Sequence, residues 1–329
     1  MAEGVIGYSE SETGSVPRHS SLYSRHSRNY VERVSVEIST IMTRLGYGEE
    51  IRLWRVAKYR ELGKLHNKAM VSFGLMGAKH YNNMNIIAGS KAEGLTCHLE
   101  SDIDLLMVLP YSLCVEAGIN LHTIEDDIDL FIMDTRVYPG HCKLLLERQG
   151  SIRTLLINYS LCDNGYGDVL LRSSFLLDAY LIIPQLCPQY EDLVFLGGMV
   201  GEERAGPSLP HTDVKGIFRM DKVLALRCLC PSILNRWASR PCHWPSPVIV
   251  QKVVTLGAYL TPVGFKGSES KHMEWRICFN TGETELVNNL HDTQVKVYVI
   301  LKMIVKDILK PNNKEITSYI LKKHSFMAM

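Results

Sequence analysis

Apolar and polar residues follow two different periods along this chain. Residues 31–71 carry apolar side chains three and four positions apart, interrupted near Gly46 to Gly48, which predicts two helices. Residues 85–109 predict a turn and a short helix, followed by an apolar strand from Asp102 that ends at Pro110. Residues 1–30 are rich in Ser, Gly and Arg without apolar periodicity, which predicts a disordered tail.

The middle of the chain and its end differ in the pattern of their apolar residues. Residues 129–147 predict a strand, a turn at Pro139-Gly140 and then a helix, whereas residues 216–228 alternate and predict a strand containing Asp221. From residue 236 onward the pattern is mainly helical, at 246–260 and 292–309. We therefore expect an α+β protein with a mixed lobe over residues 31–235 and a helical lobe over residues 236–329.

The composition is that of an ordinary globular protein and does not indicate a particular kind of partner. Of 329 residues, 46% are hydrophobic and 22% charged, and the net charge is +1, so any nucleic-acid role requires a local basic patch. The nine cysteines are scattered, no signal peptide precedes them, and no apolar run is long enough to span a bilayer. These features predict reduced thiols in the cytoplasm or nucleus and no membrane partner.

A zinc site is not expected. Cys228, Cys230, Cys242 and His243 are the best candidates, but their spacing fits no common zinc pattern. We interpret these cysteines as thiols that are buried or have no chemical role.

Two aspartates inside the apolar strand carry the main chemical signal. Asp102 and Asp104 are one residue apart, so both project from the same face. Such a pair can hold Mg²⁺ or Mn²⁺, and a two-metal site clamps the attacking and leaving oxygens of phosphoryl or nucleotidyl transfer. Gly89 and Ser90, about a dozen residues upstream, offer backbone N–H groups and a hydroxyl to a triphosphate. The alternative is an edge strand with two solvated carboxylates.

A second pair with the same spacing tests how specific this signal is. Asp127 and Asp129 also stand one residue apart, but no Gly-Ser pair precedes them. We interpret them as a solvated turn and the start of a strand.

Several motifs, taken in order, resemble a known family. The first is "GS…ESDIDLLMVL", which resembles the nucleotidyltransferase signature; the later ones are "MDKVLALRC", "TPVGFKG", "WRICFN" and "ITSYILKKHSF". Over residues 35–326 the chain is similar to the male abnormal 21 family, which includes cyclic GMP–AMP synthase and its invertebrate relatives. The resemblance implies a nucleotidyltransferase-fold sheet lobe followed by a helical lobe.

The resemblance also implies roles for individual residues. Asp221 would be the third carboxylate of the metal site, and Ser90 would contact the triphosphate. Arg276 and Lys302 would face the nucleotides, and the pair Ser318 and Tyr319 would place a tyrosine against a base. Each has an alternative as an ordinary surface or half-buried residue.

The chain departs from the family pattern in two places. Residues 280–296 contain no cysteine, so the zinc loop with which the vertebrate sensor binds DNA is absent. The chain ends about ten residues after Tyr319, where family members continue, so we expect a truncated helical lobe. Many family members also keep the fold without demonstrated catalysis.

Two functions follow from these observations. The first is a metal-dependent nucleotidyltransferase that makes a cyclic dinucleotide or a short oligonucleotide from ATP and GTP, in innate immune signalling. The second is a non-catalytic binding or regulatory scaffold with the same fold.

A basic stripe suggests an activating ligand for the enzyme. Arg60, Lys64 and Lys68 recur every four residues on the second predicted helix, with Arg52, Arg55 and Lys58 on a neighbouring face. Such residues can bind the phosphates of double-stranded RNA or DNA through counterion release. The alternative is a solvated helix face.

Overall fold

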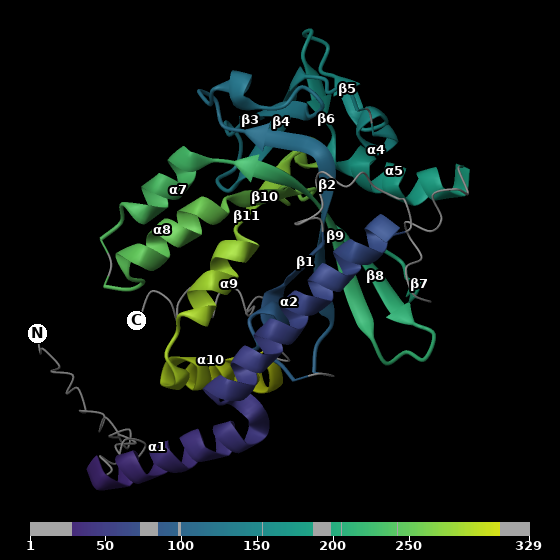
Figure 1. The fold of residues 1–329 in the computed structure, drawn as a ribbon. Helices are drawn as coiled ribbons and strands as arrows, with labels where there is room; N and C mark the ends of the chain where they lie inside the picture. Colours follow the sequence, from purple (N-terminus) through teal and green to yellow (C-terminus); the bar gives the residue numbers. More distant parts are fainter. Residues whose placement is uncertain are drawn as a thin grey trace, which may run out of the picture. The chain divides into compact units, whose positions relative to one another are not determined.

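The computed structural model describes seven stretches of the chain, residues 28–72, 85–97, 100–152, 154–186, 199–204, 206–241 and 243–309 (Figure 1). The chain divides into two compact units, Met1–Ile41 and Met42–Met329. The described part of the first unit is helix α1 (Arg28–Met42) without its last residue. The second unit combines helices with one sheet, so the protein is of the α+β class, as the pattern predicts.

The expected pair of helices with a break is confirmed. Helix α1 is followed by a π-helical turn η1 (Thr43–Tyr47) and by helix α2 (Glu49–Ser72). Gly46 inside η1 has a φ of +87°, a backbone conformation that glycine adopts at little cost. The glycine therefore explains why the helix does not continue.

Six strands of the sheet close into a ring. The ring runs from β2 (Ile103–Val115) through β3 (Asp129–Asp134), β4 (His141–Arg148), β11 (Trp275–Cys278), β10 (Ala258–Thr261) and β9 (Arg219–Leu229), which pairs again with β2. Strand β2 runs parallel to β3 and β9, and its first half also pairs antiparallel with β1 (Asn85–Ala88). The remaining strands extend the edges: β5 (Leu161–Asp163), β6 (Val169–Leu171), β7 (Met199–Gly201) and β8 (Ser208–Asp213).

The main core lies on one face of these strands. Phe131, Leu144, Leu226, Leu260 and Trp275 are each fully buried there, from five different strands of the ring. Burying one such side chain stabilises the fold by about 1.5–3 kcal/mol. The Trp275 indole N–H donates to the Leu171 carbonyl at 2.9 Å, so the ring is buried without an unpaired donor.

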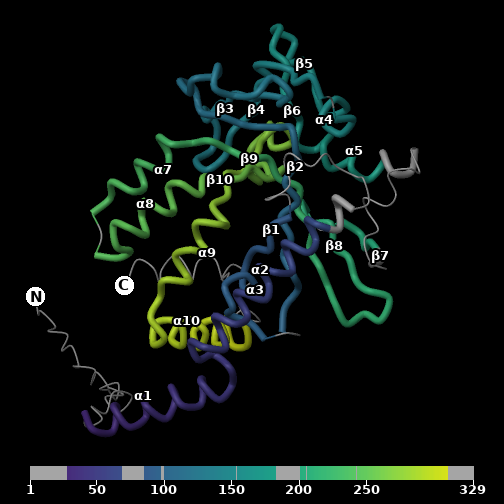
Figure 2. The backbone as a smooth tube through the Cα atoms, viewed as in Figure 1, coloured from purple at the N-terminus to yellow at the C-terminus, as the bar shows by residue number. Residues whose placement is uncertain are grey.

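Short helices surround the sheet (Figure 2). Their bounds are α3 (Gly89–Ala92), α4 (Leu155–Asn158), α5 (Ser173–Leu186), α7 (Pro231–Ala238), α8 (Pro247–Leu256), α9 (Asn280–Asn288) and α10 (Asp292–Ile304), with the turns η3 (Leu121–Thr123), η5 (Lys271–Met273) and η6 (Val305–Leu309). Val287, Val295 and Val299 of α9 and α10 pack with Tyr47 and Leu95 in a second core. No helix in the described residues has the length and apolar character needed to cross a membrane.

Two predicted elements are wrong in detail. Strand β2 does not end at Pro110 but continues to Val115, because a register shift between Val108 and Leu113 lets the strand pass the proline. Tyr111 has a φ of +56° within this irregularity. Residues 141–148 are a strand rather than a helix, since Cys142 and Leu144 alternate into the core between strands β3 and β11.

The predicted helical lobe also contributes to the sheet. Helices α8 and α10 confirm the helical pattern of residues 247–256 and 292–304, but β10 and β11 come from the same region. Both strands lie between β9 and β4, so residues 236–309 complete the sheet that the preceding residues begin.

Candidate functional site

Two of the predicted metal ligands face each other across neighbouring strands. In the parallel pairing of β2 with β9, Asp104 is the register partner of Asp221. On its other side Asp104 pairs with Ala88 of β1. Register partners on adjacent strands project from the same face, so both carboxylates lie on one side of the sheet.

Asp102 completes the acidic region from outside the strand. It lies one residue before β2 begins and is exposed. It lines a cavity of about 280 Å³ together with Gly216 and Phe218. Asp102 and Asp221 both contribute negative charge at Asp104.

Burial and these neighbouring charges raise the pKa of Asp104 to about 6. Asp104 is exposed to solvent, although many protein atoms lie around its carboxyl. After burial, the negative charge of Asp221 is the largest cause, followed by that of Asp102. A cation bound here would relieve the repulsion.

Gly89 is required by the close approach of Asp104. Gly89 has a φ of +65°, and a Cβ atom at this position would overlap the Asp104 carboxyl. Only glycine combines this backbone conformation with this contact. The Gly-Ser turn and the first aspartate strand are thus packed directly against each other.

Ser90 is held by a lysine from the far end of the chain. Lys302 on α10 donates from Nζ to Ser90 Oγ at 2.7 Å. Burial lowers the pKa of Lys302, while the negative charges of Glu93, Glu100 and Asp104 act in the opposite direction. The hydrogen bond brings the predicted lysine and the predicted serine together beside the carboxylates.

Arg276 lies on the same sheet face, further from the aspartates. It is exposed on β11 and pairs in register with Thr261, while its neighbour Trp275 points into the core. Tyr259, two residues before Thr261, packs with Leu106, which shares the face of Asp104. Ser318 and Tyr319 lie outside the described residues.

A polar network that the sequence did not reveal supports the segment before Asp102. Lys91 is 1% exposed, and its Nζ donates to the Cys97 carbonyl at 2.5 Å. The Glu100 carboxylate accepts from the Cys97 N–H at 2.7 Å and from the Tyr47 hydroxyl at 3.0 Å. Burial alone would raise the pKa of Glu100, but these hydrogen bonds hold it below its usual value. The only sequence signal for this network was the cluster of charged residues around Gly-Ser.

The predicted basic stripe on α2 is only partly a surface. Arg52 and Arg55 are 2% and 7% exposed, so their assignment to a nucleic-acid face is wrong. Arg55 donates to the Gly94 carbonyl at 2.9 Å and to the Gly46 carbonyl, and Arg52 contacts Asn288 at 3.4 Å. Both guanidinium groups therefore join α2 to its neighbours. The other four cations are exposed: Lys58, Arg60, Lys64 and Lys68.

The second aspartate pair marks the start of a strand, as predicted, since β3 begins at Asp129, but Asp129 is not solvated. Asp129 is 2% exposed and accepts from the Gly150 N–H at 2.8 Å. Its carboxylate fixes the loop that follows β4, which the spacing alone could not show.

The carboxylate oxygens of the site are suitable ligands for a hard divalent cation. Carboxylate oxygens are what Mg²⁺ and Mn²⁺ prefer, and Mg²⁺ is commonly held by one or two carboxylates together with water and phosphate oxygens. Nowhere in the described residues do three or more His, Cys, Asp or Glu side chains gather into a group that could hold a metal. Asp104 and Asp221 are the carboxylates that the strand register pairs directly, and Asp102 lies close enough for its charge to act on Asp104.

Comparison with known proteins leaves the family open. No protein-family model matches this chain, and no curated protein matches its sequence. The similarity to the male abnormal 21 family therefore stays a prediction based on short motifs.

Proposed function

We propose that this protein is a metal-dependent nucleotidyltransferase that joins ATP and GTP into a cyclic dinucleotide or a short oligonucleotide. The observation that carries the proposal is the register of Asp104 opposite Asp221, with Gly89 packed against the Asp104 carboxyl. Burial and then the negative charge of Asp221 raise the pKa of Asp104 to about 6, and a bound cation would offset both.

Asp104 and Asp221, with Asp102 nearby, would hold Mg²⁺ or Mn²⁺. A bound divalent ion would supply charge neutralisation at the transferred phosphate and orient its oxygens. Ser90 and Lys302 would bind the triphosphate, because a hydroxyl and an ammonium group lie together beside the carboxylates. Arg276 would approach a nucleotide from the same sheet face.

The proposed reaction uses this placement. A 2′- or 3′-hydroxyl of one nucleotide attacks the α-phosphate of another, its proton passes to a carboxylate of the site, and pyrophosphate leaves. A second attack of the same kind within the linear product, with loss of a second pyrophosphate, would close the ring. No protein nucleophile is needed, since positioning and charge stabilisation supply the rate enhancement.

Activation by double-stranded RNA or DNA is a further part of the proposal. Arg60, Lys64 and Lys68 recur on α2 and are exposed, and Lys58 is exposed beside Glu61. A cytoplasmic or nuclear location is supported by the seven described cysteines, all of which are free thiols.

The test is a product assay with matched variants. Purified protein is incubated with radiolabelled ATP and GTP, Mg²⁺ and a panel of double-stranded RNA and DNA. We expect product from the wild type, a loss of at least a hundredfold in Asp104→Asn/Asp221→Asn, and normal activity in Asp307→Asn, whose aspartate is exposed on η6. Absence of product under every condition, together with no Mg²⁺-dependent binding of ATP by calorimetry, would refute the enzyme.

The second candidate function is a non-catalytic scaffold. It is favoured by the same survey of the described residues, in which no three-residue metal group is found. A scaffold would keep the Lys302–Ser90 contact as a purely structural link between α10 and α3, and Lys302→Met would then change stability without changing nucleotide binding.

A further inference from the structure

One exposed face of α2 carries a stripe of side chains that lie alternately three and four positions apart. The stripe consists of Ile51, Trp54, Lys58, Glu61 and Leu65, and all five are exposed. Its three large apolar members, Ile51, Trp54 and Leu65, are 47%, 62% and 54% exposed. This spacing is the one with which one helix packs against another helix. We refer to these five residues as the α2 stripe.

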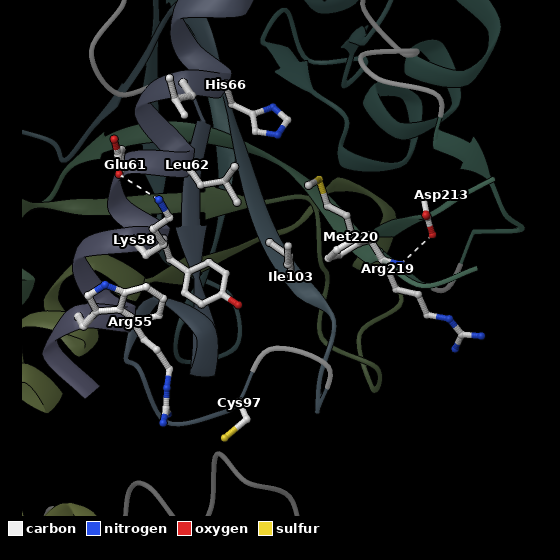
Figure 3. A pocket seen from close by; sticks show the side chains of 14 residues that line it. Arg55, Lys58, Glu61, Leu62, His66, Cys97, Ile103, Asp213, Arg219 and Met220 are labelled. Carbon is white, nitrogen blue, oxygen red and sulfur yellow. Dashed lines mark hydrogen bonds and ion pairs between the residues drawn. The ribbon is translucent and has the colours of Figure 1, made fainter. Parts of the chain in front are cut away.

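The stripe borders an apolar groove of about 820 Å³. Figure 3 shows Lys58 and Glu61 joined on α2, with Leu62 pointing from the helix toward Ile103 and Met220 on the strands across from it. The end of the β8–β9 hairpin forms the opposite wall. A molecule that packs on the stripe therefore also covers the open side of the groove.

The other charged groups that line the groove are held by neighbours, neutral or turned away. Arg55 donates to two backbone carbonyls, and the Asp213 carboxylate accepts from two backbone N–H groups. Burial lowers the pKa of His66, so its ring is neutral at neutral pH. The Arg219 side chain extends away from the groove in Figure 3. An occupant therefore meets the lysine and the glutamate of the stripe.

The order of side chains along the stripe is complementary to itself when the helix is reversed. Four positions separate Trp54 from Lys58, and four separate Glu61 from Leu65. A second α2 that runs antiparallel, centred between the two charges, sets Trp54 opposite Leu65 and Lys58 opposite Glu61 in one register. A two-fold axis repeats each of these contacts, so both copies use the same surface.

A parallel pair of helices in the same register would not satisfy these side chains. It would set Lys58 against the Lys58 of the second copy and Glu61 against its Glu61, and like charges in contact are destabilising. At the ends of the antiparallel pair Ile51 lies opposite Lys68, whose aliphatic stem covers an apolar side chain well. The stripe therefore matches a second copy of this chain and fixes its direction.

We propose that two copies of this chain associate through the α2 stripe as an antiparallel, two-fold symmetric helix pair that covers the groove of each copy. Trp54 is the main contact, since tryptophan buries a large apolar area and often dominates interfaces. One pair of helices makes a small interface, so the dimer is reversible and forms at micromolar concentrations. Arg60 and Lys64 lie outside the stripe and stay exposed, and the dimer does not depend on the proposed nucleotidyl transfer.

Self-association is tested by sedimentation equilibrium of the full chain between about 1 and 100 µM. We expect a monomer–dimer equilibrium that Leu65→Gln weakens by at least about tenfold, because each dimer buries this leucine twice. Leu53→Gln, a matched change at an exposed leucine of α2 outside the stripe, should leave the equilibrium unchanged. A monomer at every concentration, or equal effects of the two substitutions, would overturn the proposal.

Exchanging the charges tests which side chains meet. Lys58→Glu makes both charges of the stripe negative and Glu61→Lys makes both positive, so each variant alone should dimerise at least about fivefold more weakly than the wild type. An equimolar mixture of the two variants should dimerise about as tightly as the wild type, because every Lys–Glu contact is restored between unlike copies. The double variant Lys58→Glu/Glu61→Lys should dimerise with itself for the same reason.

The mixture also shows that a weakened variant is still folded. All the substituted side chains are exposed, so each variant should melt within about 2 °C of the wild type. Single charge variants that dimerise as tightly as the wild type, or a mixture that dimerises no better than either variant alone, would place the contact on another surface and overturn the proposal.

Discussion

At the scale of single residues, the candidate site is defined by contacts that place like charges and small side chains together. Asp104 lies between Ala88 and Asp221, and Gly89 lies against its carboxyl. Replacing either Asp104 or Gly89 should therefore change stability in a way that ordinary surface residues do not.

Asp104→Asn should stabilise the protein at neutral pH. The unfolded chain releases this proton near pH 4 and the native protein near pH 6, so the native state binds more protons between these values. The stability of the wild type therefore falls as pH rises through this window, and the cost remains in full above it. If the whole pKa difference between the native and unfolded states became stability, Asp104→Asn would gain about 3 kcal/mol. Solvent around the carboxyl screens these charges, so we expect a gain of about 1 kcal/mol in the free energy of unfolding.

The measurement is urea unfolding of both proteins at several pH values. The difference should be largest at pH 7.5 and vanish below pH 4, while Asp307→Asn should show no such trend. A difference that is independent of pH would contradict the raised pKa.

Gly89→Ala should destabilise the protein more than a glycine substitution whose only effect is the strain of a positive φ. Gly118 has a φ of +91° with open space around its Cα, so Gly118→Ala measures the conformational cost alone, about 1 kcal/mol. At Gly89 the added methyl must also displace the Asp104 carboxyl. We expect a total loss of about 2–3 kcal/mol in the free energy of unfolding, and equal losses at the two sites would rule out the close contact.

At the scale of elements, side chains from one element complete the ends of another. The clearest case is α7, which begins at Pro231 without a side-chain cap of its own. Glu116, which follows β2, accepts from the Ser232 N–H at 2.8 Å, from the Ser232 hydroxyl at 2.5 Å and from the Ile233 N–H at 3.2 Å. A carboxylate at this position also interacts favourably with the helix dipole.

Glu116→Gln should destabilise the protein by about 1–2 kcal/mol, because the amide keeps the shape but loses the charge and one acceptor oxygen. Glu147→Gln, at an exposed position on β4, is the control and should stay within about 0.5 kcal/mol of the wild type. Thermal unfolding followed by circular dichroism would measure both. A shift in Glu116→Gln no larger than in the control would show that α7 does not depend on this cap.

At the scale of the whole molecule, the ring of strands makes distant parts of the chain interdependent. Strands β10 and β11 lie between β9 and β4, and Trp275 of β11 is fully buried in the main core. A fragment that ends before β10 would leave two strand edges unpaired and remove part of the core.

Residues 42–235 alone should therefore fail to unfold cooperatively, although the sequence pattern marks residue 235 as a boundary. Residues 42–329 should show one cooperative heat-absorption peak in scanning calorimetry, because the described strands of both regions share one sheet. A cooperative peak from the shorter fragment would show that the sheet can form without β10 and β11.

Local periodicity was enough to predict part of this protein. The helix–break–helix of α1, η1 and α2, the strand β9, the helices α8 and α10 and the α+β class follow from apolar spacing and glycine placement, which act over a few residues. The spacing of Asp102 and Asp104 also indicated a chemical site, but the strand on which that argument relied begins at Ile103, so only Asp104 of the two lies in it.

Only the tertiary structure decided which partners those residues meet. Residues 141–148 form a strand because β3 and β11 flank them, and β2 passes Pro110 because a register shift absorbs the proline. Arg52 and Arg55 are buried by groups far away in sequence, such as Gly94 and Asn288, which no helical stripe can reveal. The pairings of Asp104 with Asp221 and of Ser90 with Lys302 likewise depend on strands and helices that meet across long sequence separations. Periodicity reports the local backbone and one apolar face, whereas burial, pairing and charge environment are set by residues that are adjacent only after the chain folds.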